Sequence, residues 1–322
     1  MLVYRLVRPA SVTGRFAPSP TGPLHLGSLV AALGSYLFAR SSGGSWLLRI
    51  DDLDTQRVVP GMADDILSTL EILGFCWDGE IVWQSRRAEA YSEALLSLEQ
   101  LGVVYPCGCS RGDIARIATA PHGDGDELVY PGTCRNGLAS GKEARSLRVR
   151  VPEDEIFFID GIAGPCRQRL AGICGDFVVR RADGLFAYHL ATVVDDAAAG
   201  VNQVVRGADL LASTPRQIYL QRLLGIVEPA YFHLPLVTGP DGGKLSKRDC
   251  AVSLASGRDL ERDGGGLLLA ALRFLGQPLP DLPAAAPPAD ILAAAVAGFC
   301  QDAVPASGGP FSVEAQSGQV VR

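Results

Sequence analysis

Two of the chain's three lysines, Lys244 and Lys247, stand three positions apart in the segment GKLSKR at Gly243–Arg248. Lysine and arginine together number 29, so lysine is rare, and its ammonium is a compact point charge that the planar arginine fork does not replace. Two ammonium groups on one loop can close over a triphosphate and stabilise the charge that develops as pyrophosphate leaves. A solvated basic turn is the alternative, but the scarcity of lysine favours phosphate binding.

A second candidate for phosphate chemistry is the segment PSPTGPLHLGS at Pro18–Ser28. Its prolines and glycines form a turn after a short apolar stretch, and His25 and Gly27 open the next helical pattern. Free N–H groups and the dipole make a helix N-terminus a site for phosphate. His25 can donate to a phosphate oxygen, and Gly27 lets a nucleotide approach the backbone. A simple capping turn explains the spacing equally well.

The elements around these motifs alternate between strands and helices. Val12–Ala17 predicts a strand, His25–Arg40 an amphipathic helix and Ser45–Ile50 a buried strand. This order is the βαβ unit of a doubly wound parallel sheet. Periodicity predicts further helices at 63–73, 88–101, 187–198, 214–224, 266–275 and 290–299, and strands at 146–151, 156–159, 176–181, 203–205 and 231–237.

Composition narrows the class of protein. A net charge of −6 argues against a broadly basic nucleic-acid-binding coat, although it allows a local basic patch. No apolar run approaches the roughly 18 residues of a membrane span. The segment Met1–Ser11 has no apolar core of a secretory signal, so we expect a cytoplasmic protein whose eight cysteines are thiols or metal ligands.

Three cysteines lie in a region rich in glycine and proline. Cys107 and Cys109 are followed, after a loop of 24 residues, by Cys134. Zinc takes four N, S or O ligands in a tetrahedron, so three thiols leave one position open. A metal site and free cysteines are nearly equal interpretations on spacing alone.

Together, HLGS at His25–Ser28 and KLSKR at Lys244–Arg248 resemble the HIGH and KMSKS signatures of class I aminoacyl-tRNA synthetases. Further segments resemble the glutamyl-tRNA synthetases within that class: RFAPSPTGPLHLGS at Arg15–Ser28, RIDDLD at Arg49–Asp54, DGLFAYHLATVVDD at Asp183–Asp196 and GVNQVVRGADL at Gly200–Leu210. The resemblance runs from about residue 13 to 250, and several motifs in the same order argue against chance.

The resemblance implies an α/β fold with a Rossmann-like parallel sheet, an inserted small zinc-type subdomain and a short helical C-terminal region. We accordingly expect four parts: the first half of the catalytic domain at 12–104, the insert at 105–175, the second half with the KLSKR loop at 176–250, and a helical remnant and tail at 251–322.

Length separates two related families. A glutamyl-tRNA synthetase needs a further anticodon-binding domain after the lysine loop, of about 100 residues or more. Only 74 residues follow Arg248, and many lie in Ala/Pro-rich stretches. The chain is therefore similar to the truncated paralogues, the glutamyl-Q tRNA(Asp) synthetases.

That family implies a two-step ligase. ATP with Mg²⁺ activates L-glutamate, and the glutamyl group passes to the queuosine base in the anticodon of tRNA(Asp). We expect a monomer that acts on these partners and on no membrane. Two alternatives stay open: a glutamyl-tRNA synthetase catalytic fragment that charges the tRNA 3′ end, and an inactive RNA-binding paralogue, against which the intact motifs argue.

The resemblance also assigns roles to residues. Arginine forks bind carboxylates bidentately, so Arg15 and Arg206 are the candidates for the carboxylates of glutamate. Asp51 stands where the family has a glutamate for the substrate ammonium. The full glutamate-binding set is Arg15, Phe16, Ala17, Pro18, Ser19, Asp51, Tyr188 and Arg206. The ATP-binding set is Pro18, His25, Gly27, Ser28 and Lys247, and the catalytic set is His25, Lys244 and Lys247.

For the cysteines, the family pattern is C-x-C followed by Y-x₃-C. It implies one structural zinc ion held by Cys107, Cys109, Cys134 and Tyr130. His122, inside the same loop, is the chemically more usual ligand and is the alternative to the tyrosine. The segment Arg135–Arg150 carries a surplus of four positive charges, which suits either RNA phosphates or a solvated strand edge.

Overall fold

The structure, a computed structural model, describes residues 11–117, 128–138, 141–238 and 253–311. It opens with β1 (Thr13–Phe16), α1 (Leu26–Arg40) and β2 (Ser45–Ile50). The two strands pair in parallel, and β3 (Val82–Trp83) extends the sheet in parallel beyond β2. The βαβ unit expected from the sequence is therefore confirmed.

Burial explains why this unit forms. On α1, Leu29, Leu33 and Leu37 recur at helical spacing and are almost fully buried. Trp46 on β2 is buried as well, and its indole N–H donates to the Ser35 hydroxyl of α1 at 3.0 Å. Helix and sheet thus share one apolar layer. The buried indole N–H of Trp46 has its hydrogen-bond acceptor within this layer.

A second set of parallel strands forms its own sheet next to β1. Here β9 (Gln203–Gly207), β10 (Ala230–Leu234) and β6 (Ile156–Asp160) lie side by side, with β10 between the other two. Asn202 links this set to β1, because its backbone N–H donates to the Thr13 carbonyl and its Oδ1 accepts from the Thr13 N–H. The carboxyl ends of β1, β9 and β10 therefore face one crevice, where ligands of such folds bind.

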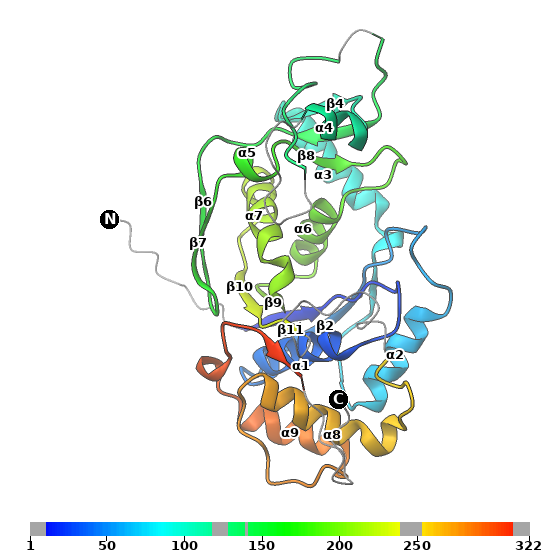
Figure 1. Ribbon diagram of the computed structural model, residues 1–322, viewed down its shortest axis with the longest axis vertical. Helices are drawn as coiled ribbons and strands as arrows, with labels where there is room; N and C mark the ends of the chain where they lie inside the picture. Colours follow the sequence, from blue (N-terminus) through cyan, green and yellow to red (C-terminus); the bar gives the residue numbers. More distant parts are fainter. Residues whose placement is uncertain (1–10, 118–127, 139–140, 239–252, 312–322) are drawn as a thin grey trace.

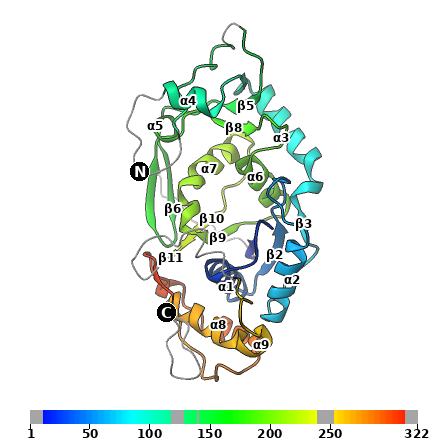
Figure 2. The same cartoon turned by 45° about the vertical axis from the view of Figure 1, so that its right-hand side comes forward.

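The segment after Tyr105 contributes to two sheets. The strands β4 (Val104–Cys107), β5 (Ser146–Val149) and β8 (Phe177–Arg180) form a small antiparallel sheet. The hairpin of β6 with β7 (Gly164–Gln168) instead joins the parallel sheet through β10. Figures 1 and 2 place the small antiparallel sheet at one end of the elongated molecule and the C-terminal helices at the other.

Helices cover both sheets. They are α2 (Met62–Ile72), α3 (Ala88–Gln100), α4 (Arg111–Ile117), α5 (Leu170–Ile173), α6 (Tyr188–Ala198), α7 (Thr214–Leu223), α8 (Leu260–Phe274) and α9 (Pro288–Ala297). Short elements complete the described chain: β11 (Val237–Thr238), β12 (Gly309–Pro310) and 3-10 turns at Gln84–Arg86, Ala208–Ser213 and Gln301–Ala303. No helix among the described residues is long and apolar enough to span a bilayer.

The start of α8 differs from the sequence-based expectation of a helix at 266–275. The helix begins at Leu260, where the Asp259 carboxylate caps the N–H groups of Glu261 and Arg262. The glycines in its first turns serve close packing. A Cβ on Gly265 would lie 2.5 Å from the Ala284 carbonyl oxygen, so a larger residue would push that loop away.

Candidate active site

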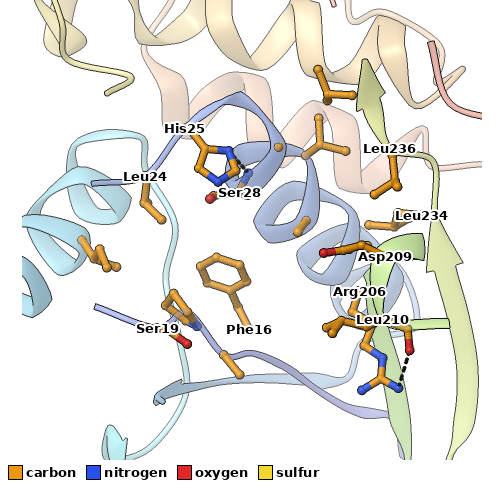
Figure 3. A pocket seen from close by; sticks show the side chains of 18 of the residues that line it. Phe16, Ser19, Leu24, His25, Ser28, Arg206, Asp209, Leu210, Leu234 and Leu236 are labelled. Carbon is orange, nitrogen blue, oxygen red and sulfur yellow. Dashed lines mark hydrogen bonds between the residues drawn. The ribbon is translucent and has the colours of Figure 1, made fainter. Parts of the chain in front are cut away.

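A cavity of about 910 Å³ lies at the carboxyl ends of β1 and β9 and at the start of α1. Figure 3 shows His25 and Ser28 on one side of it and Arg206 with Leu210 on the other. The structure brings together most of the residues that the resemblance assigned to glutamate and ATP. These lining residues are Arg15, Phe16, Ala17, Pro18, Ser19, His25, Gly27, Ser28, Tyr188 and Arg206.

His25 caps α1 and is held in one orientation. Its Nδ1 accepts the Ser28 backbone N–H at 3.3 Å, so the proton of the neutral ring lies on Nε2. Burial lowers the pKa of His25, although Asp209 opposes the shift, and this favours the neutral ring. A Cβ on Gly27 would lie 3.1 Å from the His25 imidazole, so the glycine leaves room for the ring in this orientation. The result is an N–H donor beside the N-terminus of a helix.

Arg15 belongs to a buried network of charges. Its Nε donates to both carboxylate oxygens of Asp196, at 3.2 and 3.3 Å, and Asp196 also pairs with Arg49. The two arginines lower the pKa of Asp196 although burial raises it. Next to Asp196, the Asp195 carboxylate accepts from Arg87 and from the Tyr91 hydroxyl. Each carboxylate therefore has a cationic partner, as buried charges require.

Asp51 does not line the cavity. Its carboxylate accepts from Arg49 Nε at 2.6 Å, and its backbone N–H donates to the Pro18 carbonyl. Burial raises the pKa of Asp51, and Arg49 opposes this shift. The acid that the resemblance assigns to the substrate ammonium is thus paired with a residue of the protein.

Arg206 lies opposite the helix start and is 5% exposed. Its Nε donates to His233 Nε2 at 3.1 Å, and its Nη2 donates to the Thr214 hydroxyl at 2.7 Å. Within the described residues, Nη1 has no partner and no carboxylate pairs with this guanidinium. Burial of the uncompensated charge lowers the pKa of Arg206. The cavity therefore holds a buried cation without its counter-ion.

Sequence reasoning missed the residues behind these arginines. Asp160 ends the apolar stretch IFFID, and His233 lies within the apolar stretch AYFHL. Asp196 lies within the segment DGLFAYHLATVVDD, whose resemblance to the family assigns it no role. The signal was a polar residue inside a buried strand or helix face, because such a residue must find a polar partner.

The predicted metal ligands also converge. The sulfur atoms of Cys107, Cys109 and Cys134 lie within 4.8 Å of one another, and we call these three residues the cysteine cluster. The Tyr130 hydroxyl lies 3.4 Å from the Cys107 sulfur and accepts the Cys134 backbone N–H at 2.8 Å. Three thiols and a phenol oxygen in one group are a donor set that suits zinc.

Arg148 supplies positive charge to this group. Its guanidinium lies over the Tyr130 ring, 3.8 Å from the centroid, and its Nε donates to the Cys107 sulfur at 3.3 Å. Burial raises the pKa of Cys107, but hydrogen bonds from Tyr130, Cys109 and Arg148 outweigh it and bring the pKa to about 7. The thiolate form that a metal binds is therefore accessible.

The basic segment at Arg135–Arg150 is largely engaged within the protein. Arg135 pairs with Asp176, Lys142 pairs with Asp113, and the Arg150 guanidinium lies over the Tyr105 ring. The structure therefore favours the interpretation that these charges support local structure over a free phosphate-binding face. Lys244, Lys247 and His122 lie outside the described residues.

Comparison with known proteins first defines the class. Residues 11–279 match the family described as tRNA synthetases class I (E and Q), catalytic domain, so the chain belongs to that family. Its fold is similar to the crystal structure of glutamate-tRNA synthetase from Elizabethkingia anophelis, with a TM-score of 0.78, 28% sequence identity, and coverage of 94% of this chain and 68% of the other. The Rossmann-like parallel sheet expected from the sequence is thereby confirmed.

More similar relatives narrow the class. The chain is 65% identical over 300 residues to the glutamyl-Q tRNA(Asp) synthetase of Geobacter sulfurreducens, covering 93% of this chain and 96% of that protein. It is 57% identical over 292 residues to the protein of the same name from Dechloromonas aromatica, covering 91% and 95%. Within the class, the chain thus belongs to the glutamyl-Q tRNA(Asp) synthetase family, as expected from its sequence.

Proposed function

We propose that the protein activates L-glutamate with ATP and Mg²⁺ and transfers the glutamyl group to the queuosine base in the anticodon of tRNA(Asp). One observation carries the first half of this proposal. The cavity joins a helix N-terminus with a histidine donor to a buried arginine that no carboxylate of the described residues pairs with. Such a cavity offers one position for phosphate and one for a carboxylate. The names of the relatives support queuosine and tRNA(Asp) as the acceptor.

In the first step, a carboxylate oxygen of glutamate attacks the α-phosphorus of ATP and the bond to pyrophosphate breaks. Arg206 holds a substrate carboxylate, and Arg15 lines the same cavity. The His25 Nε2–H and the first N–H groups of α1 stabilise negative charge on the phosphates. Lys244 and Lys247 neutralise the departing pyrophosphate from their loop.

In the second step, a queuosine hydroxyl attacks the carbonyl carbon of glutamyl-adenylate, and AMP leaves. Neither step needs a nucleophile from the protein. Positioning and electrostatics therefore supply the catalysis.

We further propose one structural zinc ion at the cysteine cluster, with Tyr130 as fourth ligand and His122 as the alternative. Zinc, when bound, supplies a cross-link between β4 and the chain around Cys134. We also propose that the chain has the four parts described above, is a monomer and is located in the cytoplasm.

Metal analysis tests the zinc site. We expect Cys107→Ser protein to lose its zinc, whereas Cys166→Ser, which changes a half-buried thiol outside the cluster, should retain it. Equal zinc content in the two variants would refute the site.

The acceptor is tested with labelled glutamate, ATP and tRNA(Asp) that either contains or lacks queuosine. We expect label only on the queuosine-containing tRNA, and undiminished labelling after removal of the 3′ adenosine. Labelling that ignores queuosine, or that requires the 3′ adenosine, would indicate a glutamyl-tRNA synthetase fragment. No labelling at all, from protein that is folded, would indicate the RNA-binding paralogue. Glutamate-dependent pyrophosphate exchange that persists in Lys247→Ala would refute the role of the lysine loop.

A further inference from the structure

We propose that Asp160 and His233 form a buried relay that positions Arg206 for a carboxylate of glutamate. The relay is defined as Asp160, His233 and the Arg206 guanidinium, in that order. It rests on the proposed function, since it assumes that the cavity binds glutamate. Asp160 and His233 are positioning residues, because neither lines the cavity.

Geometry links the three side chains. His233 Nδ1 lies 2.6 Å from Asp160 Oδ2, and the side chains of both residues are fully buried. On the other edge of the ring, Nε2 lies 3.1 Å from Arg206 Nε. Strands β6, β10 and β9 are neighbours in this order, so the parallel sheet itself aligns the relay.

The hydrogen-bond chemistry allows one arrangement of protons. The Arg206 Nε–H is always a donor, so His233 Nε2 must be the unprotonated acceptor, and the Thr214 hydroxyl, 3.1 Å from the same nitrogen, can donate to it as well. The ring proton therefore lies on Nδ1, which donates it to the Asp160 carboxylate. Burial favours a neutral imidazole, which is consistent with a single ring proton.

Asp160 is itself fixed by the turn after β6. Its Oδ1 accepts backbone N–H groups from Ile162 at 3.0 Å, Ala163 at 2.8 Å and His233 at 3.2 Å. These three donors leave Oδ2 as the atom that faces the imidazole. The anchor is therefore a carboxylate whose Oδ1 is held by backbone N–H groups of the turn after β6 and of β10.

The relay holds Arg206 without neutralising it. His233 and Thr214 are neutral acceptors for Nε and Nη2, while Nη1 has no partner among the residues described. A carboxylate in place of His233 would fix the guanidinium equally well, but it would compensate the charge. The arrangement thus sets the geometry of the guanidinium and leaves its charge for an anionic ligand.

The variant Asp160→Asn tests the relay with almost no change in shape. Its Oδ1 keeps the backbone donors, so its amide N–H₂ faces His233 Nδ1. The imidazole must then carry its proton on Nε2, opposite the Arg206 Nε–H, and two donors face each other. We expect the KM for glutamate in pyrophosphate exchange, with tRNA(Asp) present, to rise about tenfold, as for loss of one charge-assisted hydrogen bond. The KM for ATP should change less than about threefold.

A double-mutant cycle separates the relay from general damage. In His233→Gln, the amide oxygen can accept the Arg206 Nε–H, so we expect a smaller rise in the KM for glutamate. Adding Asp160→Asn to that background should then cost less than about threefold, because no imidazole proton is left to switch. Equal effects of Asp160→Asn in both backgrounds would overturn the relay.

The control is Gln277→Leu, which removes buried hydrogen bonds to the backbone of Cys300 beside the C-terminal helices. These bonds involve none of the three relay residues or their neighbours. We expect the KM for glutamate to stay unchanged in this variant, even if stability falls. A rise equal to that of Asp160→Asn would show that the KM responds to destabilisation alone, and would overturn the inference.

A spectroscopic measurement distinguishes failure of the relay from failure of the proposed function. With ¹⁵N-labelled histidine, of which the chain has four, we expect His233 to show the Nδ1–H tautomer in the wild type and the Nε2–H tautomer in Asp160→Asn. The Nε2–H tautomer in the wild type would overturn the relay. Absence of glutamate-dependent exchange in wild-type protein with the expected tautomer would instead refute glutamate binding, and with it the purpose assigned to the relay.

Discussion

Arg15 and Arg206 line the same cavity and are each 5% exposed, yet the protein holds them in opposite ways. Arg15 donates to the Asp196 carboxylate, within a network in which Arg49 and Arg87 also meet carboxylates. Arg206 donates only to neutral groups among the described residues. The charge of Arg15 is therefore compensated by a carboxylate, whereas the charge of Arg206 is compensated by none of the described residues.

This difference separates what supports the fold from what binds the ligand. A buried ion pair is strongly destabilised when one partner is removed, because the other charge is left alone. A buried cation without a counter-ion already destabilises the folded state in this way. A bound anion offsets this destabilisation, which is why we assign the substrate carboxylate to Arg206.

We expect the largest loss of stability when the Asp196 carboxylate, which compensates Arg15 and Arg49, is removed. We expect Asp196→Asn to lower the free energy of unfolding by about 3–5 kcal/mol, because Arg15 and Arg49 both lose their shared carboxylate. Urea denaturation measures this loss. Asp183→Asn, which removes a partly exposed partner of Arg181, is the control and should change it by less than about 1 kcal/mol.

Removing the unbalanced charge should separate activity from stability. We expect Arg206→Met to lower glutamate-dependent pyrophosphate exchange about 100-fold, or roughly 2.7 kcal/mol, with the unfolding free energy unchanged or raised. Arg15→Met should lose activity together with about 2 kcal/mol or more of stability, because Asp196 then keeps only Arg49. Equal losses of stability in the two variants would contradict the comparison.

Glutamate should stabilise the protein because its carboxylate pairs with the buried Arg206 guanidinium. At ten times its Kd, we expect it to add about 1.4 kcal/mol to the unfolding free energy and to raise the Tm. The same concentration should leave the Tm of Arg206→Met unchanged. A Tm increase of equal size in Arg206→Met would show that the carboxylate of glutamate binds a residue other than Arg206.

The smallest effect should come from a charge pair in solvent. Arg222 donates to Glu228 at 2.7 Å, but both side chains are more than a third exposed. We expect Glu228→Gln to change the unfolding free energy by less than about 0.5 kcal/mol. A loss as large as that of Asp196→Asn would show that burial does not decide the difference between the two sides of the site.

Much of the fold could be predicted from local pattern. The βαβ unit of β1, α1 and β2 follows from apolar spacing and from the turn-forming prolines and glycines between strand and helix. The start of α8 could not be predicted, because Gly265 is unfavourable in an isolated helix and becomes necessary only against the Ala284 carbonyl. Local propensity is blind to such a contact.

Part of the candidate site could also be predicted from local pattern. His25 and Gly27 lie within one short segment, so their contact with each other and with the helix start follows from spacing. The ion pair of Asp51 with Arg49 could not be predicted, because it depends on how both side chains are arranged around Asp196. The contact of Asp51 with the substrate ammonium stays a prediction.

The sequence by itself determined the class I synthetase family, through motifs whose residue types and order need no coordinates, and it predicted that two arginines reach the site. Only the tertiary structure decided which arginine has a counter-ion. Arg15 and Asp196 are 181 positions apart, and Asp160 and His233 are 73 apart. Electrostatic compensation depends on distance through space, which packing sets, so the chemical difference between the two arginines exists only in the folded chain.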